Sequence, residues 1–321
     1  MVEKEQKKAT FRAYTFILVG IFFMTTIEIT YKLIQDYGTV PPALANFFRM
    51  SLSAFVILSY IAASGGISRF IQFLKLYPKY YITASIVGIF GGVLVFMYGL
   101  SLTDPAPAAA IFSSNPIVIS TVSILFLKES KRVQKILGII IGFIGVFIII
   151  TEFKISGFFE QTNQLGNLLV FIGDVLWSIG IVIGKACMNK SEDLKKTTGM
   201  ENFDLAGISF FISTFLMIPV VYIEREFSLI LTFNWQTWIG VLFLGIFSTG
   251  VAYLFFYKGL SMVEASVGIN LFYIKPVITT ILGFFIFQAI PHYSFFIGLV
   301  LEFIGLFLVT SKMKIRRRND V

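Results

Sequence analysis

The segments "GLSLTDPAPAAAIFSSNPIVIS" at 99–120 and "GLSMVEASVGINLFYIKPVITT" at 259–280 begin alike and lie 160 residues apart. The same shift places Pro116 on Pro276, in the middle of both apolar stretches. It also relates Phe112 to Phe272, Gly138 to Gly298, and Phe143-Ile144-Gly145 to Phe303-Ile304-Gly305. A shift of 153 relates Gly20 and Lys32 to Gly173 and Lys185. Fixed shifts with glycine and proline in register predict two copies of one structural unit.

The composition indicates that both copies are embedded in a membrane. Of the 321 residues, 56% are hydrophobic and 14% are charged, whereas soluble domains carry about 25% charged residues. The net charge of +8 comes from basic residues that flank apolar stretches, so we expect no nucleic-acid partner. One cysteine and one histidine are too few for a zinc cluster or an internal disulfide. The chain also lacks a GxxxxGKS/T phosphate loop. We therefore expect no cofactor, no metal and no enzymatic activity.

Ten apolar stretches follow one another, each near the ~20 residues that a helix needs to cross a bilayer. We place them at about 13–34, 44–64, 80–100, 105–127, 131–151, 164–186, 204–223, 235–257, 264–287 and 291–311. Each copy holds five spans, and because five is odd, the copies cross the membrane in opposite directions. The predicted fold is an all-α polytopic membrane protein with ten transmembrane helices as two inverted five-helix repeats. We expect a cytoplasmic tail at 1–12, repeats at 13–151 and 164–311, and a basic cytoplasmic tail at 312–321.

Lysine and arginine predict the orientation of these spans. With the first tail inside, almost all basic residues outside the spans fall in cytoplasmic segments, and the external loops hold only Lys154 and Arg225. Membrane proteins retain positive charge on the cytoplasmic side. We therefore expect a multi-pass protein of the cytoplasmic (plasma) membrane with both termini in the cytoplasm.

The repeated tract is followed by glycine-spaced spans, "ILGIIIGFIGVFIII" at 136–150 and "FIGLVLEFIGLFLV" at 296–309. Together with Gly20 to Lys32 and Arg49 in "FFRM", these features resemble the drug/metabolite transporter superfamily in its ten-span form with two EamA domains. The resemblance implies a secondary transporter, and most readily the export of amino acids or related metabolites. Two positions depart from it: Glu129 aligns with Ala289, and Gly142 with Glu302.

Lys275 is the most informative charge inside the spans, because a charge at this depth costs several kcal/mol by insertion scales. Its counterpart in the first copy is Asn115, so the fold itself does not require a charge here. The lysine therefore either binds an anionic group of the substrate or neutralises Asp174 or Glu302, which lie at similar depth. Those two acids are the candidates for charge pairing or for coupling transport to an ion.

The prolines Pro116 and Pro276 predict kinks at matching positions of the fourth and ninth spans. Carbonyl groups freed by a kink must face protein or water, which predicts a central cavity between spans one, two, three, four, six, eight and nine. The candidate substrate-binding residues are Lys275, Asn115, Trp177, Asn270, Tyr273, Glu28 and Arg49. Of these, the aromatic side chains would hold an apolar part of the substrate, and the asparagines and the lysine a polar or anionic part.

Three of the candidate residues also have simpler interpretations. Glu28 and Lys32 have the i,i+4 spacing of a local ion pair on one helix. Arg49 is also explained as an anchor at the membrane interface, and Glu302 as a packing partner of the last span. These alternatives remain open at the level of the sequence.

The sequence thus predicts a secondary transporter that moves a small polar or amphipathic metabolite by alternating access. An alternative is a proton-coupled antiporter of cationic drugs, in which Asp174 or Glu28 carries the proton. A different class is a membrane protein that does not transport, such as a lipid scramblase or a sensor. The expected partners are a small-molecule substrate and the lipid bilayer, with protons as the candidate coupling ion and the chain acting as a monomer.

The predicted orientation is tested by labelling introduced cysteines in whole cells. Cysteines at Thr39 and Asn163 should react with an impermeant thiol reagent applied outside, and cysteines at Ser68 and Ser191 should not. The reverse pattern would exclude cytoplasmic termini.

Overall fold

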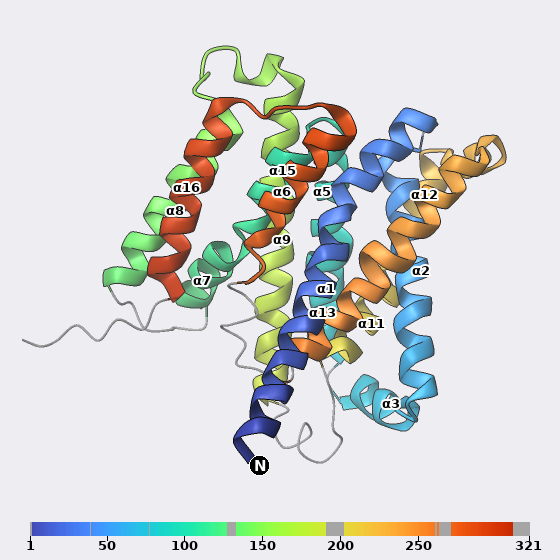
Figure 1. Ribbon diagram of the computed structural model, residues 1–321. Coiled ribbons are helices and arrows are strands. Elements are labelled where there is room, and N and C mark those ends of the chain that lie inside the picture. The colour runs from blue at the N-terminus through green and yellow to red at the C-terminus, as the bar shows by residue number, and fades with distance from the viewer. Residues whose placement is uncertain are drawn as a thin grey trace, which may run out of the picture.

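The computed structural model describes residues 2–38, 40–76, 78–126, 133–190, 202–260, 262 and 271–310. In these ranges the chain is a bundle of helices and short connections without strands (Figure 1). Within the described ranges, nine helical spans are long and apolar enough to cross a membrane, and the shorter apolar helix α15 adds a tenth. Residues 263–270, in or beside the predicted start of the ninth span, lie outside the described ranges, as does the basic tail from 311 onward. The protein is a multi-pass membrane protein.

The first repeat comprises the elements α1 (Val2–Tyr37), α2 (Pro42–Ala63), α3 (Ile67–Leu76), α4 (Pro78–Ala84), η1 (Ser85–Gly92), α5 (Val93–Ser101), α6 (Pro105–Ser113), α7 (Asn115–Phe126) and α8 (Val133–Thr151). The short η2 (Phe158–Glu160) lies in the connection between the repeats. The second repeat comprises α9 (Thr162–Lys190), α11 (Asn202–Ile223), η3 (Glu226–Thr232), α12 (Trp235–Gly245), η4 (Ile246–Val251), α13 (Ala252–Leu260), α15 (Ile274–Phe287) and α16 (Tyr293–Thr310). The third span is α4–η1–α5, the fourth is α6–α7, and the eighth is α12–η4–α13. In the third and eighth spans, π-helical turns η1 and η4 fall at corresponding positions of the two repeats.

Repeat symmetry appears in how the helices pack. The first span packs on the eighth, and the sixth packs on the third. A Cβ at Gly20 would lie 2.6 Å from the backbone nitrogen of Phe256, and a Cβ at Gly173 would lie 2.7 Å from that of Phe96. Only glycine permits such close backbone approach. Gly20 and Gly173 are related by the shift of 153, and Phe96 and Phe256 by the shift of 160. The repeats predicted from the sequence are therefore present in the packing.

The last helices of the two repeats, α8 and α16, pack against each other along a glycine stripe (Figure 1). A Cβ at Gly138 would lie 2.6 Å from the carbonyl oxygen of Gly305, and one at Gly145 would lie 2.5 Å from that of Gly298. Without side chains at these positions, the two backbones come into direct contact. This pair stands at one side of the bundle and leaves the other eight spans to surround the centre.

At the end of the bundle where α2 begins, Glu226 on η3 binds the first turn of that helix. The backbone N–H of Leu44 donates to Glu226 Oε2 at 2.8 Å, which satisfies one of the free N–H groups at the start of α2. Burial, and after it the neighbouring Glu224, raise the pKa of the Glu226 carboxyl from 4.5 to about 7. Tyr98 OH donates to Glu224 Oε1 at 2.5 Å, which ties η3 to the third span as well.

The raised pKa of Glu226 predicts a pH-dependent stability. Between pH 4.5 and about 7 the folded protein holds a proton that the unfolded chain releases, so the free energy of unfolding should fall as pH rises through this window. Glu226→Gln keeps an acceptor for Leu44 but cannot titrate. In thermal unfolding, the stability of the purified variant should therefore lack this part of the pH dependence. At pH ~8 the variant should be more stable than the wild type.

Glu160→Gln supplies the control, because Glu160 is an exposed glutamate in another connection between spans. It should follow the wild-type profile. Equal pH slopes for wild type and Glu226→Gln would show that this carboxyl titrates at its ordinary pKa.

Candidate functional site

The centre of the bundle is built around two interrupted spans. In the fourth span α6 ends at Ser113 and α7 begins at Asn115, and the N–H of Ile117 donates to the oxygen of Ser114 at 2.8 Å. In the ninth span a turn precedes α15, and the N–H of Lys275 donates to the oxygen of Phe272 at 3.0 Å. In both spans a proline, Pro116 or Pro276, lies in the first turn of the helix after the interruption and cannot donate to the preceding turn. The interruptions bring Asn115 and Lys275 to matching places inside the bundle.

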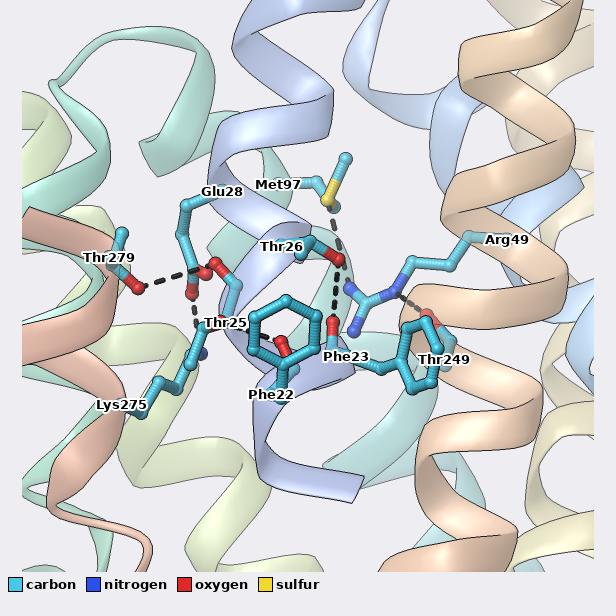
Figure 2. Close-up of polar contacts among 10 residues, drawn as sticks. All are labelled: Phe22, Phe23, Thr25, Thr26, Glu28, Arg49, Met97, Thr249, Lys275 and Thr279. Carbon is cyan, nitrogen blue, oxygen red and sulfur yellow. Dashed lines mark hydrogen bonds and ion pairs between the residues drawn. The ribbon is translucent and has the colours of Figure 1, made fainter. Parts of the chain in front are cut away.

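Lys275 forms a buried ion pair with Glu28 of α1. Its Nζ lies 2.5 Å from Glu28 Oε1, and the two side chains are 2% and 0% exposed. Figure 2 shows Lys275 reaching Glu28 from α15, next to a hydrogen bond of 3.3 Å from Thr279 Oγ1 to the carbonyl oxygen of Thr25. The ammonium also lies 5.3 Å from the ring centre of Phe112, within the range of a cation–π contact. The pair therefore joins the first span to the ninth.

This pairing excludes two of the alternatives that the sequence left open. Lys275 is paired with neither Asp174 nor Glu302, and Glu28 is not paired with Lys32. Lys32 instead lies 3.9 Å from Asp104, and both of these side chains are largely exposed, at 41% and 55%. The i,i+4 rule describes an isolated helix, whereas packing of α1 against α15 gives Glu28 a closer partner.

Arg49 is buried without an acidic partner among the described residues. It is 4% exposed, its Nε donates to Thr249 Oγ1 at 2.9 Å, and its Nη1 donates to Met97 Sδ at 3.8 Å. Thr249 belongs to the π-helical turn η4, and its hydroxyl in turn donates to the oxygen of Leu244 at 3.0 Å. A guanidinium has five N–H donors, so one hydroxyl and one thioether compensate it weakly. Figure 2 shows this cluster and the Glu28–Lys275 pair on either side of α1.

Arg49 and Lys275 line the same small cavity. Its volume is about 20 Å³, which is enough for roughly one water molecule. Phe96, Phe112 and Phe272 are among its walls. The lining side chains come from spans one, two, three, four, eight and nine, all of which the sequence predicts to border the central cavity.

A larger vestibule of about 400 Å³ adjoins this cavity. Asn115 and Trp177 line it, and it extends to Lys135 in the first turn of α8 and to the end of α16. Phe272 lines both spaces, and Phe112 lies between the cavity and Trp177, with its ring centre 5.5 Å from that of Trp177. The sixth span therefore contributes to the vestibule, and aromatic rings separate the vestibule from the charged cavity.

The remaining candidates lie apart from both spaces or outside the description. Asp174 accepts a hydrogen bond of 3.2 Å from Ser114 Oγ, and Tyr273 packs its ring edge-on against Phe303 at 5.8 Å. Neither residue lines the cavity or the vestibule, and the same holds for Glu302. Asn270 lies outside the described residues.

Sequence reasoning missed Thr249, Met97 and Tyr253 as neighbours of Arg49 or walls of the cavity. Thr249 carried a signal, because it is a polar residue in the middle of the apolar eighth span. Phe112 and Phe272 carried another, because they coincide under the shift of 160. Met97 and Tyr253 carried no signal that distinguishes them from ordinary packing residues.

Paired repeats with interrupted helices around a charged cavity are the architecture of a membrane transporter. Comparison with known proteins agrees with this class. The EamA-like transporter family matches residues 11–151 and again residues 164–311. The chain therefore belongs to the EamA-like transporter family.

Relatives span nearly the whole chain. The chain is 27% identical over 282 residues to "Uncharacterized transporter YyaM" of Bacillus subtilis, which covers 88% of each chain. It is 25% identical over 315 residues to an "Uncharacterized transporter" of Clostridium kluyveri, which covers 97% of this chain and 96% of the relative. A solved structure described as "Crystal structure of protein" has the same fold, with a TM-score of 0.58 and 20% identity over 95% of this chain and 96% of the other.

The ion pair predicts a specific pattern of stability. Lys275→Met leaves the carboxylate of Glu28 buried without a partner, which should lower the free energy of unfolding by about 3–5 kcal/mol. Adding Glu28→Gln removes that charge and should restore most of the loss. Chemical unfolding of the purified protein in detergent measures both changes.

Lys32→Met is the matched control, because Lys32 belongs to an exposed ion pair. It should change the free energy of unfolding by no more than about 1 kcal/mol. A Lys275→Met variant as stable as this control would contradict the buried pair.

Proposed function

We propose that this protein is a secondary transporter that carries a small metabolite with an anionic group, an amino acid or a related compound, across the cytoplasmic membrane. The observation that carries the proposal is the buried Arg49 guanidinium, which borders a central cavity and has no acidic partner among the described residues. Burying a charge without a counter-charge is costly. A substrate carboxylate at Arg49 would supply the missing charge through paired N–H···O bonds.

Lys275 supports the same substrate class in a different way from that expected. Its charge is balanced by Glu28, so it contributes a polar wall while Arg49 provides the net positive charge. The two charged side chains that line the cavity, Arg49 and Lys275, are both cationic. This disfavours the alternative of a cationic-drug antiporter. Trp177 and Asn115 would meet the apolar and polar parts of the substrate in the vestibule.

The two spaces support transport by alternating access. A cavity for one water molecule is too small for a metabolite, and the vestibule opens toward the end of the bundle that the basic residues predict to be cytoplasmic. A substrate entering from that end would reach Arg49 only when the rings of Phe112 and Phe272 move. The proposal also places both termini in the cytoplasm and takes export as the direction of transport. A single chain is the transporting unit.

Ligand binding by the purified protein provides the first test. A thermal-shift screen against amino acids, other carboxylates and organic cations should show stabilisation by carboxylate-bearing compounds, because a ligand that binds the folded state raises its apparent stability. Counterflow in proteoliposomes should then show transport of the same compounds. Stabilisation by cations alone would contradict the proposal.

Arg49→Met should weaken binding of the stabilising carboxylate. Losing a charge-assisted hydrogen bond costs about 1.5–3 kcal/mol, which corresponds to roughly 10- to 100-fold in the dissociation constant. The stability of the ligand-free variant should hold or rise, because a charge without an acidic partner is removed. Arg225→Met, at an exposed site next to η3, is the control and should bind as wild type.

A further inference from the structure

A short amphipathic helix, α3, connects the second and third spans. After α2 the chain turns at Gly65, which has a φ of 72°, and α3 lies across the end of α2 (Figure 1). Its ten residues are too few to cross a bilayer. The polar residues Ser68, Gln72 and Lys75 share one face and are exposed. The opposite face carries four apolar residues, Ile67, Phe70, Ile71 and Leu74. This pattern is typical of a helix that lies in the membrane interface.

An apolar groove of about 460 Å³ lies beside α3. Phe70 and Leu74 of α3 form part of its wall, and the rest comes from α2, α4, η1 and α11. Among the described residues that line the groove, only Tyr81 has a polar side chain, and its hydroxyl donates to the carbonyl oxygen of Leu74 at 2.9 Å. Ile82 and Ile86 in the wall are exposed on the outside of the bundle. The groove therefore faces lipid and is separate from the central cavity.

The length of the groove matches one leaflet of a bilayer. On α11 its wall extends from Ile208 to Leu216, which a rise of 1.5 Å per residue makes about 12 Å. Half of the ~30 Å hydrocarbon core is roughly 15 Å. Ile208 packs against Tyr81 and Leu74, so the groove begins beside the interfacial helix α3 and runs from there into the hydrocarbon. A lipid chain that enters from this interface can occupy it along its length.

The interfacial end of the groove is basic. Residues 64–84 include three basic residues and no acidic one. Lys75 follows Leu74 on α3, and Lys79 lies in the first turn of α4. Both lysines are exposed, and neither forms an ion pair with another described residue. The acid of the neighbouring α11 is Asp204, which is buried. An anionic group at this end would therefore meet positive charge that the described residues leave unbalanced.

We propose that α3 and the groove form a binding site for one anionic phospholipid, with an acyl chain in the groove and the anionic headgroup at Lys75 and Lys79. Basic segments at the ends of membrane spans bind anionic headgroups, and the apolar groove requires a chain that a soluble anion lacks. The bound lipid contacts the second, third and seventh spans together, so it stabilises the arrangement that brings them into contact. The site does not depend on the substrate or the direction proposed for transport. Only its assignment to the cytoplasmic leaflet depends on the predicted orientation.

Native mass spectrometry of the purified protein tests the headgroup part of this site. Phosphatidylglycerol should bind with a lower Kd than phosphatidylcholine that carries the same acyl chains. Lys75→Gln combined with Lys79→Gln should raise the Kd for phosphatidylglycerol roughly 5-fold for each lysine and remove most of the preference. The matched control is Lys154→Gln combined with Arg225→Gln, which removes the same charge from exposed sites at the other end of the bundle (Figure 1). It should bind both lipids as the wild type does.

Ile86→Trp tests the acyl-chain part, because the larger side chain occupies the groove. It should weaken the binding of both lipids, whereas Ile140→Trp, at an exposed position of α8 outside the groove, should not. Unchanged binding by Ile86→Trp would overturn the groove as the site of the chain.

The lysine variants decide the question even if Ile86→Trp fails to fold, because both lysines are exposed. Equal affinity of the wild type for the two lipids would overturn the proposal. The same holds for an equal loss of affinity in the two charge variants, since binding would then follow the net charge of the protein. A dimer in place of lipid-bound monomers would show that a second copy of the chain covers the groove, and would also overturn it.

Discussion

The ammonium of Lys275 lies in the low-dielectric centre of the bundle, and the fold must neutralise it there. The interrupted ninth span brings this side chain inward, and Glu28 of the first span pairs with it, with 2.5 Å between Lys275 Nζ and Glu28 Oε1. Because a buried ion pair is stable only with both partners present, α1 and α15 are held together where the two repeats meet. This link leaves Arg49, across α1 from the pair, as the buried cation without an acid of its own (Figure 2).

The aromatic partition separates the charged cavity from the vestibule. Phe112 and Phe272 occupy equivalent positions of the two repeats, and each forms part of the wall of the charged cavity. Rings at this position lower the local dielectric around Arg49 and the ion pair, which strengthens the charge interactions inside. They also lie beside the two helix interruptions, where fewer backbone hydrogen bonds resist movement.

Much of the fold was predictable because its determinants are local. Span length, the repeat register and the glycine positions are read directly from the chain, and the structure confirms the two inverted five-helix repeats. The partner of Lys275 was not predictable, because it depends on the rotation of α1 about its axis relative to α15. The π-helical turns that place Thr249 beside Arg49 were missed for the same reason, since they reflect packing between helices. The roles of Lys275, Arg49 and the other site residues in binding stay predictions.

The symmetry of the scaffold stands in contrast to the asymmetry of its charges. Under the repeat shifts, Lys275 corresponds to Asn115 and Glu302 to Gly142, while Glu28 corresponds to Ile181 and Asp174 to Ile21. Each of these four charges therefore occupies a place where the other copy has a neutral residue. The glycine contacts and the proline-linked interruptions, by contrast, recur in both copies. Because the architecture does not need these charges and burial makes them costly, we propose that they serve the recognition of a solute.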